Sequence, residues 1–485
     1  MLFGAPLFAQ QRQLHNPDII IGELIKVIPS LKDYKTPEGF HAPITRIKDR
    51  VVGLNEDNEN VQRIQYSKVE TPDPVVQTAK GSVSGSNMVG NLQSPNPTPN
   101  AFSGGVVTQN FAGLPYTNVA PADPNMCAGP TAVIQTINNS SSSYFKIWDR
   151  NGNVLLNQTL IVNLVASPGY TGSGDPVAVY DQLADRYLLT EFGHAGAGSG
   201  INTLIACVSQ TNNPLGAWYI YKFTDNSFFP DYPKWGAMPN AYFASTNDFN
   251  TAGTAYLGSS IYAFNKVKML AGDATAEAQR FRLAFNTFPV NVIGATPPAV
   301  TQPGMFMYYS DDDFTVDPND KDSLGIITFA PNFAVPANTV VTWSQALMTA
   351  PFKSNFCGGR NCVPSASGNG YDGLADRIMN RVIYRNFGTY ESMVLNYTVD
   401  ANVGLGSPRA GLRWYELRRS TPVSPWTIYQ QSTYAPCGND WRWMGSININ
   451  SKGQIALGYD LSSTTKFASM YFTGRNATDP LNTMT

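Results

Sequence analysis

The pattern Tyr-Asp-x-Leu-Ala-Asp-Arg occurs twice in this chain, and each copy runs into an apolar, aromatic stretch. The first copy starts at Tyr180 and the second at Tyr371. The text after each copy also corresponds, with short apolar segments, a Trp-Tyr pair at 218–219 or 414–415, and another tryptophan-led segment. The repeat therefore covers a group of strands rather than one loop. Four-stranded groups that recur along one chain are typical of a β-propeller.

The composition agrees with an all-β chain. Charged residues make up 14% and aromatic residues 12% of the 485 residues, with 41 glycines and 34 prolines. Few charges, many aromatics and plentiful turn formers are typical of short strands joined by tight turns. We predict one β-propeller over residues 106–485 with about six to eight four-stranded blades, since a blade takes roughly 40–50 residues. A β-sandwich array would need linkers between its domains, and none is visible after residue 105.

The residues before the predicted propeller divide into three parts. Residues 1–9 are apolar and end in a small residue, which indicates the remnant of a secretory signal peptide. Residues 10–70 form a small segment whose apolar run 18–28, DIIIGELIKVI, predicts a strand, with a short helix after it. Residues 71–105 are rich in Pro, Gly, Ser and Asn, so we expect a linker or an extended arm.

Charge and hydropathy exclude two classes of partner. The formal net charge is −2, so the chain has no basic field that would hold a nucleic acid or an anionic membrane. No stretch reaches the roughly 18 consecutive apolar residues that span a bilayer as a helix. Histidine chemistry is also scarce, because only His194 of three histidines falls in the predicted propeller. A multi-histidine metal site is thereby excluded there, a Ser-His-Asp triad is disfavoured, and we expect no cofactor other than Ca²⁺.

The five cysteines support a secreted location. Cys357 and Cys362, in CGGRNC, are close enough for a small looped disulfide in a Gly-rich turn, and we predict that bond. A second expectation pairs Cys127 with Cys207, because both lie near the start of the propeller in neighbouring strand groups. Cys437 is left without an assigned partner.

Six ordered segments carry a resemblance to a known family. They are NVAPADPNMCAGP, GDPVAVYDQLADRYLLTEF, FPDYPKWGAMPNAYFAS, LADRIMNRVIYRNFG, GLRWYELRRS and RWMGSININSKGQIALGYD. Over about residues 105–485 they resemble a family of large secreted β-propeller-like proteins of Bacteroidetes-type bacteria, many of which end in a type IX secretion sorting domain. The resemblance implies a propeller at the cell surface or outside the cell, and it transfers no catalytic residues. Such proteins usually continue beyond the point equivalent to Thr485, so we expect a propeller truncated at its C-terminal end.

Two functions remain open. The first is a binding, adhesion or assembly scaffold whose loops contact a glycan, a surface protein or further copies of the same chain. The alternative is a sialidase-like glycoside hydrolase on the propeller axis, which needs converging arginines, a tyrosine nucleophile with an acidic partner, and an acid. Residues of those types are Tyr180, Asp185, Arg186, Tyr371, Asp376, Arg377, Arg413, Glu416 and Arg442.

Two features of these residues favour the scaffold. The Asp-Arg pairs recur in what are expected to be equivalent hairpin turns, where Asp accepts turn N–H groups and Arg pairs with acids or carbonyls of neighbouring blades. A catalytic site has no reason to be copied in that way. Arg413 and Glu416 have opposite parity within one strand, so they should face different sides of the sheet.

An acidic run after residue 310 is a candidate calcium site. Asp311, Asp312, Asp313 and Asp317 lie close together in YYSDDDFTVDPNDKD, and Ca²⁺ takes six to eight oxygen ligands in flexible geometry. The run does not match an EF-hand. A solvated acidic loop explains the same residues, and both interpretations stay open.

Overall fold

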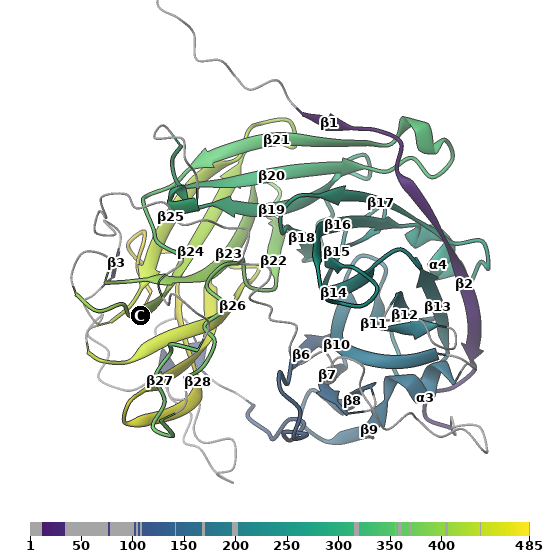
Figure 1. Ribbon diagram of the computed structural model, residues 1–485, viewed down its shortest axis with the longest axis horizontal. Coiled ribbons are helices and arrows are strands. Elements are labelled where there is room, and N and C mark those ends of the chain that lie inside the picture. Colours follow the sequence, from purple (N-terminus) through teal and green to yellow (C-terminus); the bar gives the residue numbers. More distant parts are fainter. Residues whose placement is uncertain are drawn as a thin grey trace, which may run out of the picture.

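The structure is a computed structural model. It describes residues 12–33, 76–77, 101–102, 105–106 and 109–484, apart from gaps at 141, 167–169, 196–201, 315–319, 355, 357–360, 369, 403–405 and 437. Strands are the main regular structure of the described residues, and they form blades arranged around a central axis (Figure 1). The fold is all-β and is a β-propeller, as the repeat predicts.

Six groups of consecutive antiparallel strands form the blades of the described chain. Blade 1 consists of β6 (Asn125–Ala128), β7 (Ala132–Asn139), β8 (Ser142–Asp149) and β9 (Val154–Leu160). Blade 2 consists of β10 (Tyr170–Asp181), β11 (Arg186–Ala195), β12 (Thr203–Ser209) and β13 (Trp218–Thr224). Blade 3 consists of β14 (Phe229–Ala237), β15 (Tyr242–Phe249), β16 (Tyr256–Phe264) and β17 (Glu277–Leu283). Blade 4 consists of β18 (Phe288–Ile293), β19 (Gly304–Ser310), β20 (Ser323–Ala330) and β21 (Val340–Met348). Blade 5 consists of β22 (Val382–Asn386), β23 (Glu391–Asp400), β24 (Ala410–Arg419) and β25 (Thr427–Tyr434). Blade 6 consists of β26 (Trp441–Ile449), β27 (Ile455–Ser463) and β28 (Lys466–Arg475).

Little of the described chain is helical. The helices are α3 (Ile161–Val165), α4 (Lys266–Ala271) and the short 3₁₀ helices η1 (Asp312–Phe314) and η2 (Pro336–Asn338). Asn265 caps α4 by accepting a hydrogen bond from Lys268 N, and Gly272 ends the helix in the left-handed conformation. No helix in the described residues is long and apolar enough to cross a membrane.

The N-terminal segment adds strands to the outer edges of several blades. β1 (Gln13–Leu14) pairs with β21 of blade 4. β2 (Asp18–Ile28) pairs first with β17 of blade 3 and then with β13 of blade 2, so one strand crosses the seam between two blades (Figure 1). β3 (Val76–Gln77) pairs in parallel with β25 of blade 5. The apolar run predicted as a strand is thus β2, and it covers edges that would otherwise expose unpaired N–H and C=O groups.

Gly22 lies where β2 passes from one blade to the next. Its N–H donates a 2.7 Å hydrogen bond to Ala276 O. A Cβ atom at this position would come within 2.4 Å of the Phe223 ring and 2.7 Å of Ala276 O. The crossing is therefore possible because glycine lets the backbone approach both neighbours closely.

The apolar core lies between the faces of successive blades. Phe145 of blade 1 and Leu189 of blade 2 belong to one buried cluster, and the cluster between blades 2 and 3 includes Trp235 stacked on Phe264 at 4.5 Å. Other clusters join blades 3, 4 and 5 and blades 5 and 6. Successive side chains of a strand point to opposite faces of the sheet, so every second residue contributes to the packing between two blades.

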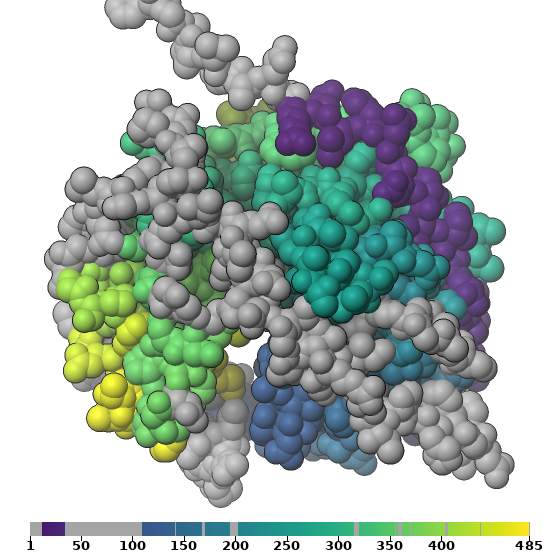
Figure 2. All heavy atoms as spheres, in the orientation of Figure 1, coloured from purple at the N-terminus to yellow at the C-terminus, as the bar shows by residue number. Residues whose placement is uncertain are grey.

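Within the described residues, no apolar cluster joins blade 1 to blade 6. Figure 2 shows an opening between the atoms of blade 6, in yellow, and those of blade 1, in blue. The outward face of blade 1 is instead covered by residues 111–122, with Leu114 packed near Trp148. On blade 6, Met444, Phe467 and Met470 are exposed.

The two copies of the repeated pattern have different structures. The first forms the turn between β10 and β11, as predicted, and the Asp181 carboxylate accepts N–H bonds from Leu183 and Ala184. The second lies in irregular chain before β22, so the expectation of two equivalent hairpin turns is wrong, although the three strands predicted after it are present as β22, β23 and β24. Arg186 bonds to carbonyls of its own turn, Ala184 O and Asp185 O, rather than to a neighbouring blade.

The cysteines correct one expectation. Cys127 and Cys207 are both free and buried, so the predicted bond between them is wrong. Each thiol lies in a strand whose neighbours fill the core between blades 1 and 2, and burial raises the pKa of the Cys127 thiol to about 12. Cys362 is disulfide-bonded. Cys357 and Cys437 lie outside the described residues, so the pairing of Cys357 with Cys362 stays a prediction.

Candidate functional site

Residues 371–381, which we call the axial segment, lie where the blades converge. Arg381 Nη2 donates a 2.7 Å hydrogen bond to Ala178 O in β10 and a 3.4 Å bond to Asn125 Oδ1 in β6. The Arg377 guanidinium lies 4.8 Å from the ring centroid of Tyr232 in β14. One short piece of chain thus contacts blades 1, 2 and 3.

The axial segment also reaches the other three blades. Tyr309 Oη, in β19, donates to Ala375 O at 2.9 Å, and Met379 N donates to Asn396 O, in β23, at 2.9 Å. The Tyr371 ring stacks on Trp443 of β26 with centroids 5.4 Å apart. All six blades therefore have a direct contact with this segment, which occupies the axis at that level.

Local interactions fix the shape of the axial segment. Arg377 is 2% exposed and binds Asp376 through Nε at 3.0 Å and Nη2 at 2.9 Å. Such a bidentate pair satisfies a guanidinium that burial would otherwise destabilise. Asp372 Oδ1 accepts from Leu374 N at 2.8 Å, and Leu374 has φ +42°. The predicted residues Tyr371, Asp376 and Arg377 thus belong to the axial segment.

Aspartates stand at the start of the inner strand in blades 1, 2 and 3. Asp123 (φ +43°) precedes β6, and Asp175 (φ +52°) lies in a β-bulge of β10. Asp231 lies at a bulge of β14 and precedes Tyr232, which has φ +50°. Asp175 and Asp231 are 4% and 6% exposed. Left-handed backbone at non-glycine residues is strained, and bulges with such residues often re-aim side chains at functional sites.

Asn138 connects two of these aspartates. Its Nδ2 donates to Asp123 Oδ2, and its Oδ1 accepts a 2.9 Å bond from Asp175 N. Carboxylates held in this way can act as acids, bases or ligand acceptors. The sequence analysis missed them. The signal that could have found them is the pairing of Asp with Pro, at Asp123-Pro124 just before β6, at Asp175-Pro176 within β10 and at Pro230-Asp231 within β14.

The first copy forms a separate polar cluster at the other end of β10. Tyr180 Oη donates to Asp185 Oδ1, and Asn212 Nδ2 donates to Asp185 Oδ2 at 2.7 Å. Burial and the bond to Asp185 raise the pKa of the Tyr180 hydroxyl. The structure therefore brings the predicted tyrosine and its acidic partner together in the turn between β10 and β11.

Asp181 of the same turn joins blades 2 and 3. Its carboxylate forms a buried 2.6 Å ion pair with Lys266 Nζ. Lys266 Nζ also donates to Met238 O at 2.9 Å and lies 5.2 Å from the centroid of the Tyr242 ring. Asp181, the first acid of the repeated pattern, therefore links blades 2 and 3.

The remaining predicted residues lie elsewhere in blades 5 and 6. Arg413 is fully buried and donates to Thr433 Oγ1, Ala350 O and Pro351 O at 2.7–3.1 Å. Glu416 faces the opposite side of the sheet, as its parity predicts, and accepts from Ser392. Arg442 Nη1 donates to Asp440 O at 3.1 Å. Arg413 and Glu416 lie in β24 of blade 5, whereas the Tyr180–Asp185 pair lies in blade 2.

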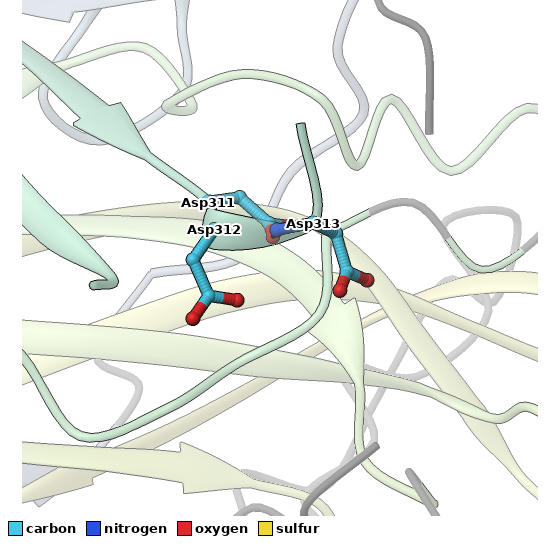
Figure 3. Close-up of side chains that lie close together, drawn as sticks. All are labelled: Asp311, Asp312 and Asp313. Atoms are coloured by element: carbon cyan, nitrogen blue, oxygen red, sulfur yellow. Dashed lines mark hydrogen bonds between the residues drawn. The ribbon is translucent and has the colours of Figure 1, made fainter. Parts of the chain in front are cut away.

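The acidic run beyond β19 supports the backbone around it. Asp311, Asp312 and Asp313 each have a carboxylate oxygen within 4.8 Å of the others, and Asp312 and Asp313 leave the turn in different directions (Figure 3). Asp311 is buried, and its oxygens accept from Asp313 N at 2.9 Å, Ser354 N at 2.7 Å and Ser354 Oγ at 2.6 Å. Burial raises the pKa of Asp311. Asp317 lies outside the described residues.

Asp322 makes a second link of this kind. Its Oδ1 accepts from Asp312 N at 2.8 Å and its Oδ2 accepts from Phe352 N. Burial, together with the neighbouring Asp311 carboxylate, raises the pKa of Asp322 to about 7. The carboxylates of the run therefore already serve as acceptors for the chain around residues 352–354, and the calcium interpretation stays a prediction.

Comparisons with known proteins give no family. No protein-family model matches the sequence, and no curated protein is significantly similar to it. Among solved structures, an α-L-arabinanase of Penicillium chrysogenum complexed with arabinobiose is 11% identical with a TM-score of 0.35, over 76% of this chain and 97% of that one. A GH93 α-L-arabinofuranosidase of Fusarium graminearum, complexed with arabinobiose, is 9% identical with a TM-score of 0.35, over 74% and 94% of the two chains. An endo-arabinase of Bacteroides thetaiotaomicron is 10% identical with a TM-score of 0.32, over 76% and 98%.

Proposed function

We propose that this chain is a secreted or cell-surface β-propeller that binds glycans without cleaving them. The observation that carries the proposal is the axial segment. Residues 371–381 contact all six blades and place Arg377, Asp376 and Tyr371 in contacts within the protein at the axis. In a propeller hydrolase the axis has to admit the scissile bond between two carboxyl groups roughly 5–10 Å apart.

The placement of the hydrolase candidates supports the same proposal. Arg413 donates to carbonyl and hydroxyl acceptors of blade 5 and its neighbouring chain, and Glu416 lies on the other face of the same sheet. A secreted location is supported by the apolar start of the chain and by the disulfide at Cys362. Protein ligands and self-association are the other partners that such a scaffold would take.

A paired binding and turnover experiment tests the proposal. Purified protein would be applied to a glycan array and, in parallel, incubated with chromogenic glycosides and with the same glycans in solution. We expect glycan binding with no release of reducing ends or chromophore. Release of product from any glycan, abolished by substitution at the axis, would overturn the binding proposal.

A glycoside hydrolase is the second candidate, and the buried aspartates at two β-bulges favour it. Asp175 and Asp231 are buried at bulges of neighbouring inner strands, where backbone strain is typical of functional groups. If this candidate is right, Asp175→Asn and Asp231→Asn should each reduce turnover by at least about 100-fold while glycan binding persists. Asp33→Asn, on an exposed residue far along the chain from both, is the matched control.

A further inference from the structure

The strongest unassigned site lies at the edge of blade 5, where an arginine is held between aromatic rings. The Arg418 guanidinium is 3.5 Å from the ring centroid of Tyr429 and 4.4 Å from that of Tyr390. Tyr390 in turn stacks on Phe387, with centroids 4.7 Å apart and planes 12° apart. We call the row Phe387, Tyr390, Arg418 and Tyr429 the Arg418 clamp.

The strand register explains how Tyr429 comes to lie over Arg418 in the Arg418 clamp. Glu416 pairs with Gln430 and Leu417 pairs with Ile428, so Tyr429 is the extra residue of a β-bulge in β25. A bulge redirects the side chain of the inserted residue. Here it places the Tyr429 ring, which is 40% exposed, over the guanidinium of the neighbouring strand.

An ion pair with Glu416 fixes the orientation of the Arg418 guanidinium. Arg418 Nε donates to Glu416 Oε1 at 2.6 Å, and Glu416 is fully buried. Ser392 Oγ donates to Glu416 Oε1 at 3.1 Å, and Gln430 Nε2 donates to Oε2 at 2.5 Å. Both carboxylate oxygens are therefore engaged, and the arginine side chain cannot swing without breaking this network.

The outer edge of the guanidinium remains available. The Arg418 side chain is 23% exposed, and among the described residues no hydrogen bond involves its Nη groups. Two parallel N–H donors on a rigid plane match the two oxygens of a carboxylate. The flanking tyrosine rings offer apolar faces against which a sugar ring can pack.

Charge at this edge is balanced before a ligand arrives. Arg475 is 1% exposed and lies within electrostatic range of Glu416, Arg418 and Tyr429, and Asp479 lies near Arg475. Glu416 and Asp479 thus offset Arg418 and Arg475. An incoming carboxylate meets no unpaired acid at the free guanidinium edge, since both Glu416 oxygens are already bonded.

We propose that the Arg418 clamp binds a uronic-acid residue of an acidic glycan, with the ligand carboxylate on the Nη edge and the sugar ring against Tyr429. The inference rests on the proposed glycan-binding function and adds the ligand class and the site. A neutral sugar would use only the aromatic rings and would leave the two Nη donors without an ionic partner.

Titration calorimetry with trigalacturonate tests the proposal on the full chain. Wild-type protein should bind trigalacturonate and should bind galactotriose, which lacks the carboxylates, far more weakly. Arg418→Gln should weaken trigalacturonate binding about 10- to 100-fold, because it removes hydrogen bonds to a charged group. Arg418→Lys, which keeps the charge but loses the planar donor pair, should also weaken it. Tyr429→Ala should weaken binding while leaving the arginine in place.

Two matched variants control for general effects. Arg282→Gln changes an arginine that also lies over an aromatic ring, Phe228, but on blade 3. Tyr116→Ala changes an exposed tyrosine elsewhere. Both should bind trigalacturonate as wild type does, and the melting temperature of every variant checks its fold.

Specific outcomes would overturn the inference. Unchanged trigalacturonate affinity in a folded Arg418→Gln variant would do so, as would equal affinity for galactotriose or for triglutamate. Binding of neutral glycans alone would leave the proposed function intact and refute the acidic-glycan site. Absence of binding to any glycan would refute both the proposed function and the acidic-glycan site.

Discussion

The Arg381 side chain donates a 2.7 Å hydrogen bond to the carbonyl oxygen of Ala178, a residue 203 positions earlier in the chain. The same Nη2 lies 3.4 Å from Asn125 Oδ1. Burial lowers the pKa of Arg381, and the nearby Cys127 is its main electrostatic neighbour. The axial segment therefore ends in a cation that ties blade 5 to blades 1 and 2 across the axis.

Replacing Arg381 should destabilise the whole propeller. Arg381→Met keeps much of the side-chain volume but leaves Ala178 O without its donor, so we expect a loss of about 1.5–3 kcal/mol in the free energy of unfolding. Urea denaturation measures it. Arg150→Met is the control, because Arg150 makes a longer 3.3 Å bond to Gly129 O near the surface. Equal effects in the two variants would contradict the axial role of Arg381.

Glycine at position 22 should be required for the N-terminal strand to cross between blades 2 and 3. Gly22→Ala places a Cβ within 2.4 Å of the Phe223 ring, so we expect a loss of about 1–3 kcal/mol and faster proteolysis within residues 12–33. Gly458→Ala is the matched control in β27, since its nearest neighbours lie 3.9 Å from the added atom. Undiminished protection of residues 12–33 in Gly22→Ala would show that β2 does not depend on this close approach.

The sequence predicts individual strands better than it predicts which strands pair with one another. Residues 18–28 form an apolar run rich in isoleucine, which predicts a strand, and β2 has the same bounds. Nothing local indicates that its partners are β13 and β17, since those contacts join residues far apart in the chain. The blades themselves were predictable because each is a local group of antiparallel strands.

The repeated pattern shows why a local match can mislead. In the first copy Asp181 has an ion-pair partner, Lys266, and Gln182 accepts a bond from Gly294 N. The second copy has Gly373 in place of that glutamine, and its Tyr371 stacks on Trp443 of blade 6 instead. Tertiary partners, not the six shared residues, decided which copy became a turn and which became the axial segment.

The candidate site was predictable only in part for the same reason. Tyr180 and Asp185 are five positions apart, and their contact could be anticipated from one turn. The Arg418 clamp depends on a bulge at Tyr429 and on Tyr390 in another strand connection, neither of which has a sequence signal. Asp175 and Asp231 do have one, in their adjacent prolines.

Buried carboxylates should make stability fall as the pH rises toward neutrality. Burial raises the pKa of Asp248 to about 6, of Asp460 to about 6 and of Asp322 to about 7. A folded state with a raised acid pKa binds protons more tightly than the unfolded chain does. The stabilisation from these protons is complete below about pH 4, the unfolded pKa, and is lost between about pH 4 and pH 7.

The pH effect can be assigned by substitution. In Asp322→Asn the carboxyl no longer titrates, so the free energy of unfolding should decline less between pH 5 and pH 8 than it does in wild type. Urea denaturation at both pH values gives the comparison. Asp33→Asn, on an exposed residue, should reproduce the wild-type slope. A slope unchanged in Asp322→Asn would mean that Asp322 is ionised throughout this range.

We expect the acidic run to stabilise the fold because its carboxylates accept hydrogen bonds from backbone N–H groups. Asp311→Ala leaves the N–H groups of Asp313 and Ser354 without their acceptor, and each buried unsatisfied group costs about 1–3 kcal/mol, so the melting temperature should fall clearly. Asp312→Ala should have a much smaller effect, since Asp312 is half-buried and it is its N–H, not its carboxylate, that bonds to Asp322. Adding EGTA or Ca²⁺ to wild-type protein should leave the melting temperature unchanged, because the Asp311 oxygens are already hydrogen-bonded. A rise in melting temperature with Ca²⁺ that disappears in Asp313→Ala would contradict this prediction and favour the calcium site.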